Sequence, residues 1–332
     1  MGRRLFLLLF VILVIGCSKS YEVYEAPKQT TQVQPSEQSF KKLQQENKSQ
    51  HLAEEKTSLV SDIFPGIGTG SPRRTSEGIE NQRILEAISK DGIYWIKTEF
   101  VLSDQASSPS AMIDKEGRLR VYYMDSWNNG ISVAIKDNGK WVYKKVKVAS
   151  NAAYPEVVLL SDGNYRMYYY ALLFTNTPAQ KFDVKYKINS AISNDGINFV
   201  EEGESYSDNE PIGHPDFFYE SNSPRMFITR DKNLDLLKSG DGRKWTKDPD
   251  FIADCTKSDT IKIPAGYRMH CEVFLDGKTK LFSYFSADGR KWKKEFVKIE
   301  PSLKIEKRMT GNPTVAILKD GSYVMYYTTY IN

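Results

Sequence analysis

The 332-residue sequence has only three cysteines and three histidines, which limits the metal and redox chemistry that it can support. No set of Cys and His residues has zinc-site spacing, and the sequence has no glycine-rich phosphate loop and no nucleophile elbow. The 46 basic and 42 acidic residues nearly balance, and no basic stripe stands out. Nucleic acid is therefore not an expected partner. We predict a protein without a cofactor or a bound metal.

Long hydrophobic runs are also scarce. The longest, residues 5–15, has eleven apolar residues, whereas a membrane-spanning helix needs about 20. Arg3 and Arg4 precede it, as in a signal peptide. The run ends Val14-Ile15-Gly16-Cys17, which resembles the lipobox of bacterial lipoproteins. The resemblance implies that residues 1–16 are removed and that Cys17 carries a lipid. Ser18 after the cysteine implies sorting to the outer membrane of a Gram-negative cell. The alternative to a lipoprotein leader is an ordinary signal peptide that is followed by a cysteine by chance.

Residues 17–80 have few large apolar side chains before Leu59 and are rich in Gln, Ser, Lys, Glu and Thr. Such a segment buries too little surface to offset its ordering entropy. We predict a lipidated cysteine followed by a disordered tether that reaches about 40–45 Å. Residues 81–332 have the length of one all-β domain. In an exported protein, Cys255 and Cys271 form either a disulfide or two buried free thiols, and both alternatives stay open.

One short turn motif, Ser-x-Asp-Gly-x-x-Trp, recurs through this domain. Clear copies, one of them with Phe in place of Trp, occupy residues 89–95, 193–199, 239–245 and 286–292, and a degenerate copy occupies residues 136–141. Repetition at about 45 residues, with strand-like sequence between the copies, is typical of a β-propeller. We expect the repeated Trp to pack between neighbouring blades, because an aromatic at a fixed place in each outer strand suits that role.

A second element recurs between the turns, and an apolar run with a turn signal precedes each copy. Its copies occupy residues 119–123, 165–169, 224–228, 267–271 and 323–327. Each repeat therefore holds four strands, except that the last repeat stops after two. Residues 84–89 and 94–101 supply the missing pair. The prediction is an all-β, five-bladed propeller whose last blade combines strands from both ends of the domain.

Four-stranded blades with these turns, and with inner strands that open x-Pro-z, resemble the arabinanase, invertase and levansucrase superfamily. This superfamily includes the family-43 and family-32 glycoside hydrolases, and the resemblance covers residues 81–332. It implies a glycan-active propeller with a catalytic Asp directly before Pro in the first blade and further acids in the next two. The chain departs from that pattern, because Ser108 precedes Pro109 and no blade opening has Asp before Pro.

In three of the inner strands, an acidic residue lies two positions after the first residue of the x-Pro-z pattern. These residues, Glu156, Asp216 and Asp259, are the candidate catalytic carboxylates. Alternation in a regular strand places Tyr154 with Glu156, and His214 with Asp216, on the same face. Two carboxylates about 5 Å apart would support retaining hydrolysis, and about 6.5–9.5 Å inverting hydrolysis. Two alternatives stay open: solvated residues of a narrow channel, or a cation held by the three carboxylates and His214.

Further candidates would contact a sugar rather than react with it. We predict substrate-binding roles for Tyr154, His214 and Asn312, which lie where inner strands begin. We predict the same role for Asp125 and Trp127, in the loop after the second strand of the first blade, and the alternative for this loop is an ordinary turn. His270 and Glu272 share one face of a second strand and are expected in an interior network or channel wall. The insert at residues 172–185 breaks the repeat, and long loops often carry function.

Two functions remain open. The first is a surface-anchored, glycan-active propeller, either a divergent glycoside hydrolase or a carbohydrate-binding relative that lacks the usual Asp. The second is a non-catalytic propeller that serves as a protein-interaction scaffold in the cell envelope. An open central funnel would favour chemistry, and a plugged channel would favour a scaffold.

Overall fold

The computed structural model describes residues 78–171, 185–252, 254–275, 278–300 and 302–332. These residues form 21 β-strands and one short 3-10 helix, η2 (Ile79–Asn81), with no α-helix among them. The all-β prediction is confirmed. Across these ranges no helix is long and apolar enough to cross a membrane. The predicted leader, Cys17 and the tether up to residue 77 lie outside the described residues, as does the insert up to residue 184.

Three antiparallel sheets of four strands each correspond to repeats 1, 2 and 3 of the sequence. Repeat 1 contains β3 (Ala106–Ile113), β4 (Leu119–Asp125), β5 (Gly130–Asp137) and β6 (Lys140–Lys145). Repeat 2 contains β7 (Ala152–Leu159), β8 (Tyr165–Ala171), β9 (Tyr186–Ser193) and β10 (Val200–Asp208). Repeat 3 contains β11 (Gly213–Glu220), β12 (Ser223–Arg230), β13 (Asn233–Lys238) and β14 (Thr246–Ile252).

The remaining strands form a nine-stranded sheet. Repeat 4 supplies β15 (Thr256–Ile263), β16 (Gly266–Leu275), β17 (Lys278–Ser286) and β18 (Lys293–Glu295). Repeat 5 supplies β20 (Lys307–Ile317), β21 (Tyr323–Tyr330), β1 (Gln82–Ser89) and β2 (Tyr94–Asp104), with β19 (Lys298–Glu300) beside β2. The two parts meet at a single pair, Thr279 and Met309.

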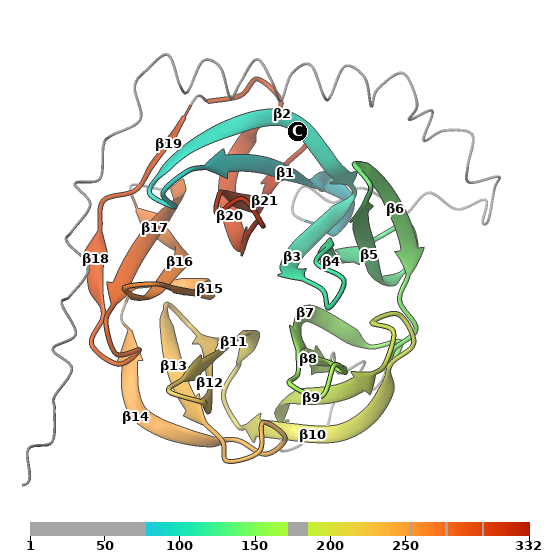
Figure 1. Ribbon diagram of the computed structural model, residues 1–332, viewed down its shortest axis with the longest axis vertical. Coiled ribbons are helices and arrows are strands. Elements are labelled where there is room, and N and C mark those ends of the chain that lie inside the picture. The colour runs from blue at the N-terminus through green and yellow to red at the C-terminus, as the bar shows by residue number, and fades with distance from the viewer. Residues whose placement is uncertain (1–77, 172–184, 253, 276–277, 301) are drawn as a thin grey trace, which may run out of the picture.

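The first and last strands of the domain are neighbours. β1 pairs with β21 along its whole length, from Gln82 opposite Tyr330 to Ser89 opposite Tyr323, as the incomplete last repeat predicts. All the sheets surround a common centre, and β3, β7, β11, β15 and β20 lie nearest to it (Figure 1). This arrangement is consistent with a β-propeller.

The turn motif is built from its own side chains. In the first copy the Ser89 hydroxyl accepts a bond from the Gly92 amide (2.9 Å), and the Asp91 carboxylate accepts bonds from the next two amides (2.8 and 2.9 Å). Gly92 has a φ of 72°, the left-handed conformation that glycine adopts without strain. The same Ser–Gly bond recurs in the copies at residues 193–199, 239–245 and 286–292.

The second repeated element holds the turn of the next repeat. Tyr122 donates its hydroxyl to the carbonyl of Gly196 (2.9 Å), and Arg120 donates to the carbonyl of Asp195 (2.8 Å). The same contacts join Tyr168 to Gly242 and Arg268 to Asp91. The turn motif and the second repeated element are therefore the two partners of one interaction that joins neighbouring repeats.

The repeated aromatic residue packs on the same second strand. The ring pairs, with their centroid distances, are Tyr122–Phe199 (6.4 Å), Tyr168–Trp245 (5.7 Å), Phe227–Trp292 (5.8 Å), His270–Trp95 (5.5 Å) and Tyr326–Trp141 (6.1 Å). Each pair joins one repeat to the next, and the buried side chains gather in clusters that likewise combine neighbouring repeats. The predicted packing role of the repeated Trp is confirmed.

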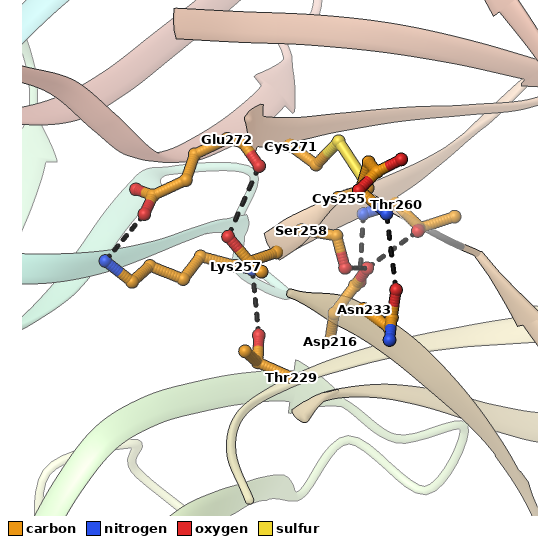
Figure 2. The surroundings of a disulfide bond; sticks show 11 residues. Asp216, Thr229, Asn233, Cys255, Lys257, Ser258, Thr260, Cys271 and Glu272 are labelled. Atoms are coloured by element: carbon orange, nitrogen blue, oxygen red, sulfur yellow. Dashed lines mark hydrogen bonds and ion pairs between the residues drawn. A yellow bond between two sulfur atoms is a disulfide. The ribbon is translucent and has the colours of Figure 1, made fainter. Parts of the chain in front are cut away.

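Cys255 and Cys271 form a disulfide bond (Figure 2). It joins the residue before β15 to the middle of β16, with the Cα atoms 5.9 Å apart, and both cysteines are fully buried. This contact decides between the two alternatives that the sequence left open.

Candidate functional site

Each inner strand carries a β-bulge near its start. The residues before the repeated Pro position, Ser108, Tyr154, His214, Lys257 and Asn312, all have φ between 47° and 52°. The pairing register shifts at the same place in every repeat. A bulge interrupts the alternation of faces, so the shared face inferred for Tyr154 with Glu156, and for His214 with Asp216, does not follow from regular strand geometry.

Two residues after each bulge position, a polar side chain accepts a hydrogen bond from the backbone of the next inner strand. The acceptors and donor amides are Ser110 and Val157 (3.1 Å), Glu156 and Phe217 (3.4 Å), Asp216 and Thr260 (2.9 Å), Asp259 and Val315 (3.0 Å), and Thr314 and Ala111 (2.8 Å). The last bond returns to the first strand. We call these five acceptor side chains the inner ring, and they link all five inner strands in a cycle.

Hydroxyl groups complete the inner ring. Ser110 donates to Glu156 (3.0 Å), and Thr314 donates to Asp259 (2.9 Å). Asp216 accepts from the hydroxyls of Ser258 (2.6 Å) and Thr260 (2.8 Å), as Figure 2 shows. The structure therefore brings the three predicted carboxylates to one ring, where each has at least two hydrogen bonds to neighbouring strands.

The three carboxyl groups share an unfavourable electrostatic environment. Burial raises the pKa of Glu156 well above its usual value, and the nearby charges of Asp259 and Asp216 raise it further. Burial and then the Asp216 charge raise the pKa of Asp259 in the same way. Burial raises the pKa of Asp216 to about 6, against the lowering effect of its hydrogen bonds. A carboxyl with a raised pKa can act as a general acid, but only where it reaches the proton acceptor.

The space at the centre is small. A cavity of about 30 Å³ lies among the bulge residues, the residues that follow them, Glu156 and Asp259. It has room for one or two waters, each of which needs at least about 10–15 Å³. Pockets for small molecules typically have about 300–1,000 Å³. Among the described residues, the centre is therefore a plugged channel rather than an open funnel.

Aromatic rings lie beside this cavity. The ring of Tyr154 stacks on His214 with centroids 3.9 Å apart and on Tyr170 with centroids 6.0 Å apart. We call Tyr170, Tyr154 and His214 the aromatic row. Burial and then the charge of Lys257 lower the pKa of His214 well below its usual value, so this ring is neutral at pH 7.

Glu272 forms part of the cavity surroundings. It bonds the ammonium of Lys257 (2.8 Å) and accepts a bond from the amide of Asn312 (3.0 Å), and Figure 2 shows its contact with Lys257. His270 is fully buried and its Nε2 lies 3.1 Å from the carbonyl oxygen of Gly92. Both residues occupy interior positions, as the sequence predicted.

Asp125 and Trp127 differ in their surroundings. Asp125 is buried and bonds the amide of Trp127 (2.9 Å), the side chain of Asn128 (2.7 Å) and the hydroxyl of Ser132 (2.7 Å), so it shapes the turn. Trp127 is 73% exposed. The turn follows β4, whose end pairs with the start of β3, so Trp127 lies on the side of the molecule where the inner strands begin.

Sequence reasoning missed the role of Ser110 and Thr314. The signal was available, because all five openings place a hydrogen-bonding side chain at the same position. The cation alternative gains no support, since no group of Asp, Glu, His and Cys within the described ranges is arranged to hold a metal ion.

The sequence matches no family model and no curated protein. Solved structures share the fold. An α-L-arabinofuranosidase from Lactobacillus brevis has a TM-score of 0.52 at 11% identity, over 68% of this chain and 85% of that one. A thermostable family-43 glycoside hydrolase has a TM-score of 0.53 at 15% identity, over 68% and 88%. A structure from the GH130 family of mannoside phosphorylases, which contains glycoside hydrolases, has a TM-score of 0.52 at 12% identity, over 80% and 95%.

Proposed function

We propose that this chain is a five-bladed propeller that binds carbohydrate and does not hydrolyse it at its centre. The observation that carries the proposal is the inner ring, because Glu156, Asp216 and Asp259 all accept hydrogen bonds that link neighbouring inner strands. Repeats 4 and 5 count as separate blades, since only one residue pair joins β17 to β20. The fold shared with glycoside hydrolases supports a glycan ligand.

Two further points argue against hydrolysis. The Asp that the family resemblance requires before Pro is Ser108, and a Ser at that place cannot act as the base alone. The cavity of about 30 Å³ beside Glu156 and Asp259 is too small to admit a sugar ring. A carboxyl that substrate cannot reach does not transfer a proton to it.

Sugar binding needs no reactive carboxyl group. Sugars pack their apolar faces on aromatic rings and hydrogen-bond to a few polar groups. The exposed indole of Trp127 supplies such a ring on the side of the molecule where the inner strands begin. Lys257 and Asn312, which line the central cavity, supply polar groups on the same side. We infer that this side binds an oligo- or polysaccharide.

The location of the protein belongs to the same proposal. A lipid on Cys17 and a tether over residues 17–80 would hold the domain of residues 81–332 near the outer membrane. A tethered domain of this kind can reach polymers around the cell.

Two observations favour a second function, a protein-interaction scaffold in the envelope. The first is the central channel, which is plugged around a cavity of about 30 Å³. In the second, Phe274 and Leu275, at the end of β16, are 70% and 43% exposed. Adjacent exposed apolar side chains are typical of interaction sites when they belong to a larger patch.

The test compares binding with turnover. The exported chain without its leader is applied to arabino-, xylo-, fructo-, manno- and galacto-configured polysaccharides, and bound protein and released reducing ends are both measured. We expect binding without release, weakened about tenfold by Trp127→Ala, because the change removes an exposed stacking ring. Phe296→Ala, which removes an aromatic side chain that is 68% exposed between β18 and β19, is the matched control.

Turnover that Glu156→Gln or Asp216→Asn abolishes would contradict the proposal and make the protein a hydrolase. A folded protein with neither binding nor turnover would favour the scaffold.

A further inference from the structure

Three repeats fill the same gap with a tyrosine ring. The first residue of the second repeated element is Tyr165 in repeat 2, Tyr267 in repeat 4 and Tyr323 in repeat 5, and each ring packs against the turn glycine of its own repeat. The ring of Tyr165 also lies 4.8 Å from the guanidinium of Arg120 in the preceding repeat. The ring of Tyr267 lies 5.7 Å from Phe218 of its preceding repeat. The tyrosine therefore fills the seam between two repeats.

Repeat 3 has Pro224 at this position. Its turn glycine, Gly242, contacts Arg166 and Tyr168 of the preceding repeat, and no ring of its own repeat packs against it. A pocket of about 220 Å³ opens there. We call it the seam pocket.

The walls of the seam pocket combine aromatic rings and one guanidinium with the carboxylates of Asp162 and Asp241. Tyr168 and Phe217 are buried, stacked rings with centroids 5.6 Å apart, and Tyr219 is 43% exposed beside them. Arg166 lines the pocket while Glu202 holds the edge of its guanidinium through bonds of 2.8 and 3.0 Å. Arg120 is the equivalent of Arg166 in the seam between repeats 1 and 2, where its guanidinium lies over the ring of Tyr165.

A hydroxyl on the ring would also find a partner. In the seam between repeats 3 and 4 the amide of Ser221 donates to the hydroxyl of Tyr267 (3.3 Å). Ser161 occupies the corresponding turn in repeat 2 and lines the seam pocket. A phenol ring fits the volume of the seam pocket, which is partly open to solvent, since an enclosed apolar cavity of about 150 Å³ holds benzene.

We propose that the seam pocket between repeats 2 and 3 binds a phenol ring supplied by a ligand. The ring takes the place of the tyrosine that Pro224 replaces, stacks on Arg166, and directs its hydroxyl toward Ser161. The site is separate from the carbohydrate-binding side, because the seam pocket follows the end of β7 whereas the central cavity lies at the starts of the inner strands.

The probe is p-cresol, the side chain of tyrosine as a free molecule, titrated into the exported chain and followed by NMR. We expect a dissociation constant on the order of 1 mM, as for a ligand of this size. Pro224→Tyr restores the ring in cis, so it should weaken binding about tenfold or more. Pro224→Ala leaves the seam pocket open and should bind p-cresol as the unaltered protein does.

One further variant and one further ligand complete the experiment. Tyr219→Ala, at a partly exposed position, should weaken binding about fivefold by removing one wall, and it keeps the test valid if Pro224→Tyr does not fold. A capped Gly-Tyr-Gly peptide distinguishes the sources of the ring: binding of the peptide supports a polypeptide ligand, and binding of p-cresol alone supports a free phenol. Failure of both probes to bind, or equal binding to Pro224→Tyr and to the unaltered protein, would overturn the proposal.

Discussion

Single carboxyl groups determine how the contacts between the inner strands respond to pH. In the inner ring, Glu156, Asp216 and Asp259 accept backbone hydrogen bonds while burial disfavours their charged forms. Repulsion by neighbouring carboxylates adds to this at Glu156 and Asp259. A buried acceptor with a raised pKa stabilises the folded state when it carries its proton. The inner ring is therefore a set of contacts between strands whose strength depends on pH.

Asp216 offers the most direct test. Its pKa is about 6 in the folded state against a usual value of 3.8, so the folded state binds this proton more tightly than the unfolded state. The stabilisation is complete below pH 4 and is lost as pH rises through about 6. At about 1.4 kcal/mol per pH unit, the free energy of unfolding should fall by about 2 kcal/mol between pH 4 and pH 7 because of this group.

Asp216→Asn removes this titration, so urea unfolding at pH 4, 5, 6 and 7 should show a flatter dependence than in the unaltered protein. Asp231→Asn, at an exposed turn position, is the control and should leave the slope unchanged. Equal slopes for Asp216→Asn and the unaltered protein would show that Asp216 titrates normally.

At the scale of strands, the repeated elements act in pairs across the boundary between repeats. The Tyr122 hydroxyl holds the next turn through Gly196. The hydroxyl of Tyr327, in the last repeat, is buried without a hydrogen-bond partner. These two fully buried tyrosines separate the value of the hydrogen bond from that of the ring.

Tyr122→Phe should lower the free energy of unfolding by about 1–2 kcal/mol, because it leaves the buried carbonyl of Gly196 without this donor. Tyr327→Phe should change it by less than about 0.5 kcal/mol, because its hydroxyl makes no bond to lose. Both values come from urea unfolding at pH 7. A cost for Tyr327→Phe as large as that for Tyr122→Phe would contradict the pairing of second strand and turn.

The turn motif made the strands predictable, because its Ser, Asp and Gly fold the turn by local bonds. The site was less accessible to sequence reasoning. Tyr154 and Glu156 share a face only in a regular strand, but φ at Tyr154 is 52° and the strand bulges there. Whether Glu156 is free to react depends on Ser110 and Phe217, which lie 46 and 61 residues away in the sequence. No local pattern reports such contacts.

The whole molecule also has a predicted position in the cell, which the described residues do not test. Cys17→Ala should remove the lipid and shift the protein from the membrane fraction to the soluble fraction, measured by fractionation and labelling with palmitate. Ser18→Asp should keep the lipid but retain the protein in the inner membrane, following the sorting rule of bacterial lipoproteins. Membrane association of Cys17→Ala equal to that of the unaltered protein would contradict lipidation at Cys17.

The pairing of β1 with β21 also sets an order of events during synthesis. The ribosome makes β1 first and β21 last, so β1 waits for its partner until almost the whole domain has been produced. The inner ring closes equally late, because Thr314 in the last repeat binds the amide of Ala111 in the first. Contacts between such distant positions form slowly. For the exported chain that we propose, this delay leaves the β1–β21 pair and the inner ring incomplete until the final residues of the domain are present.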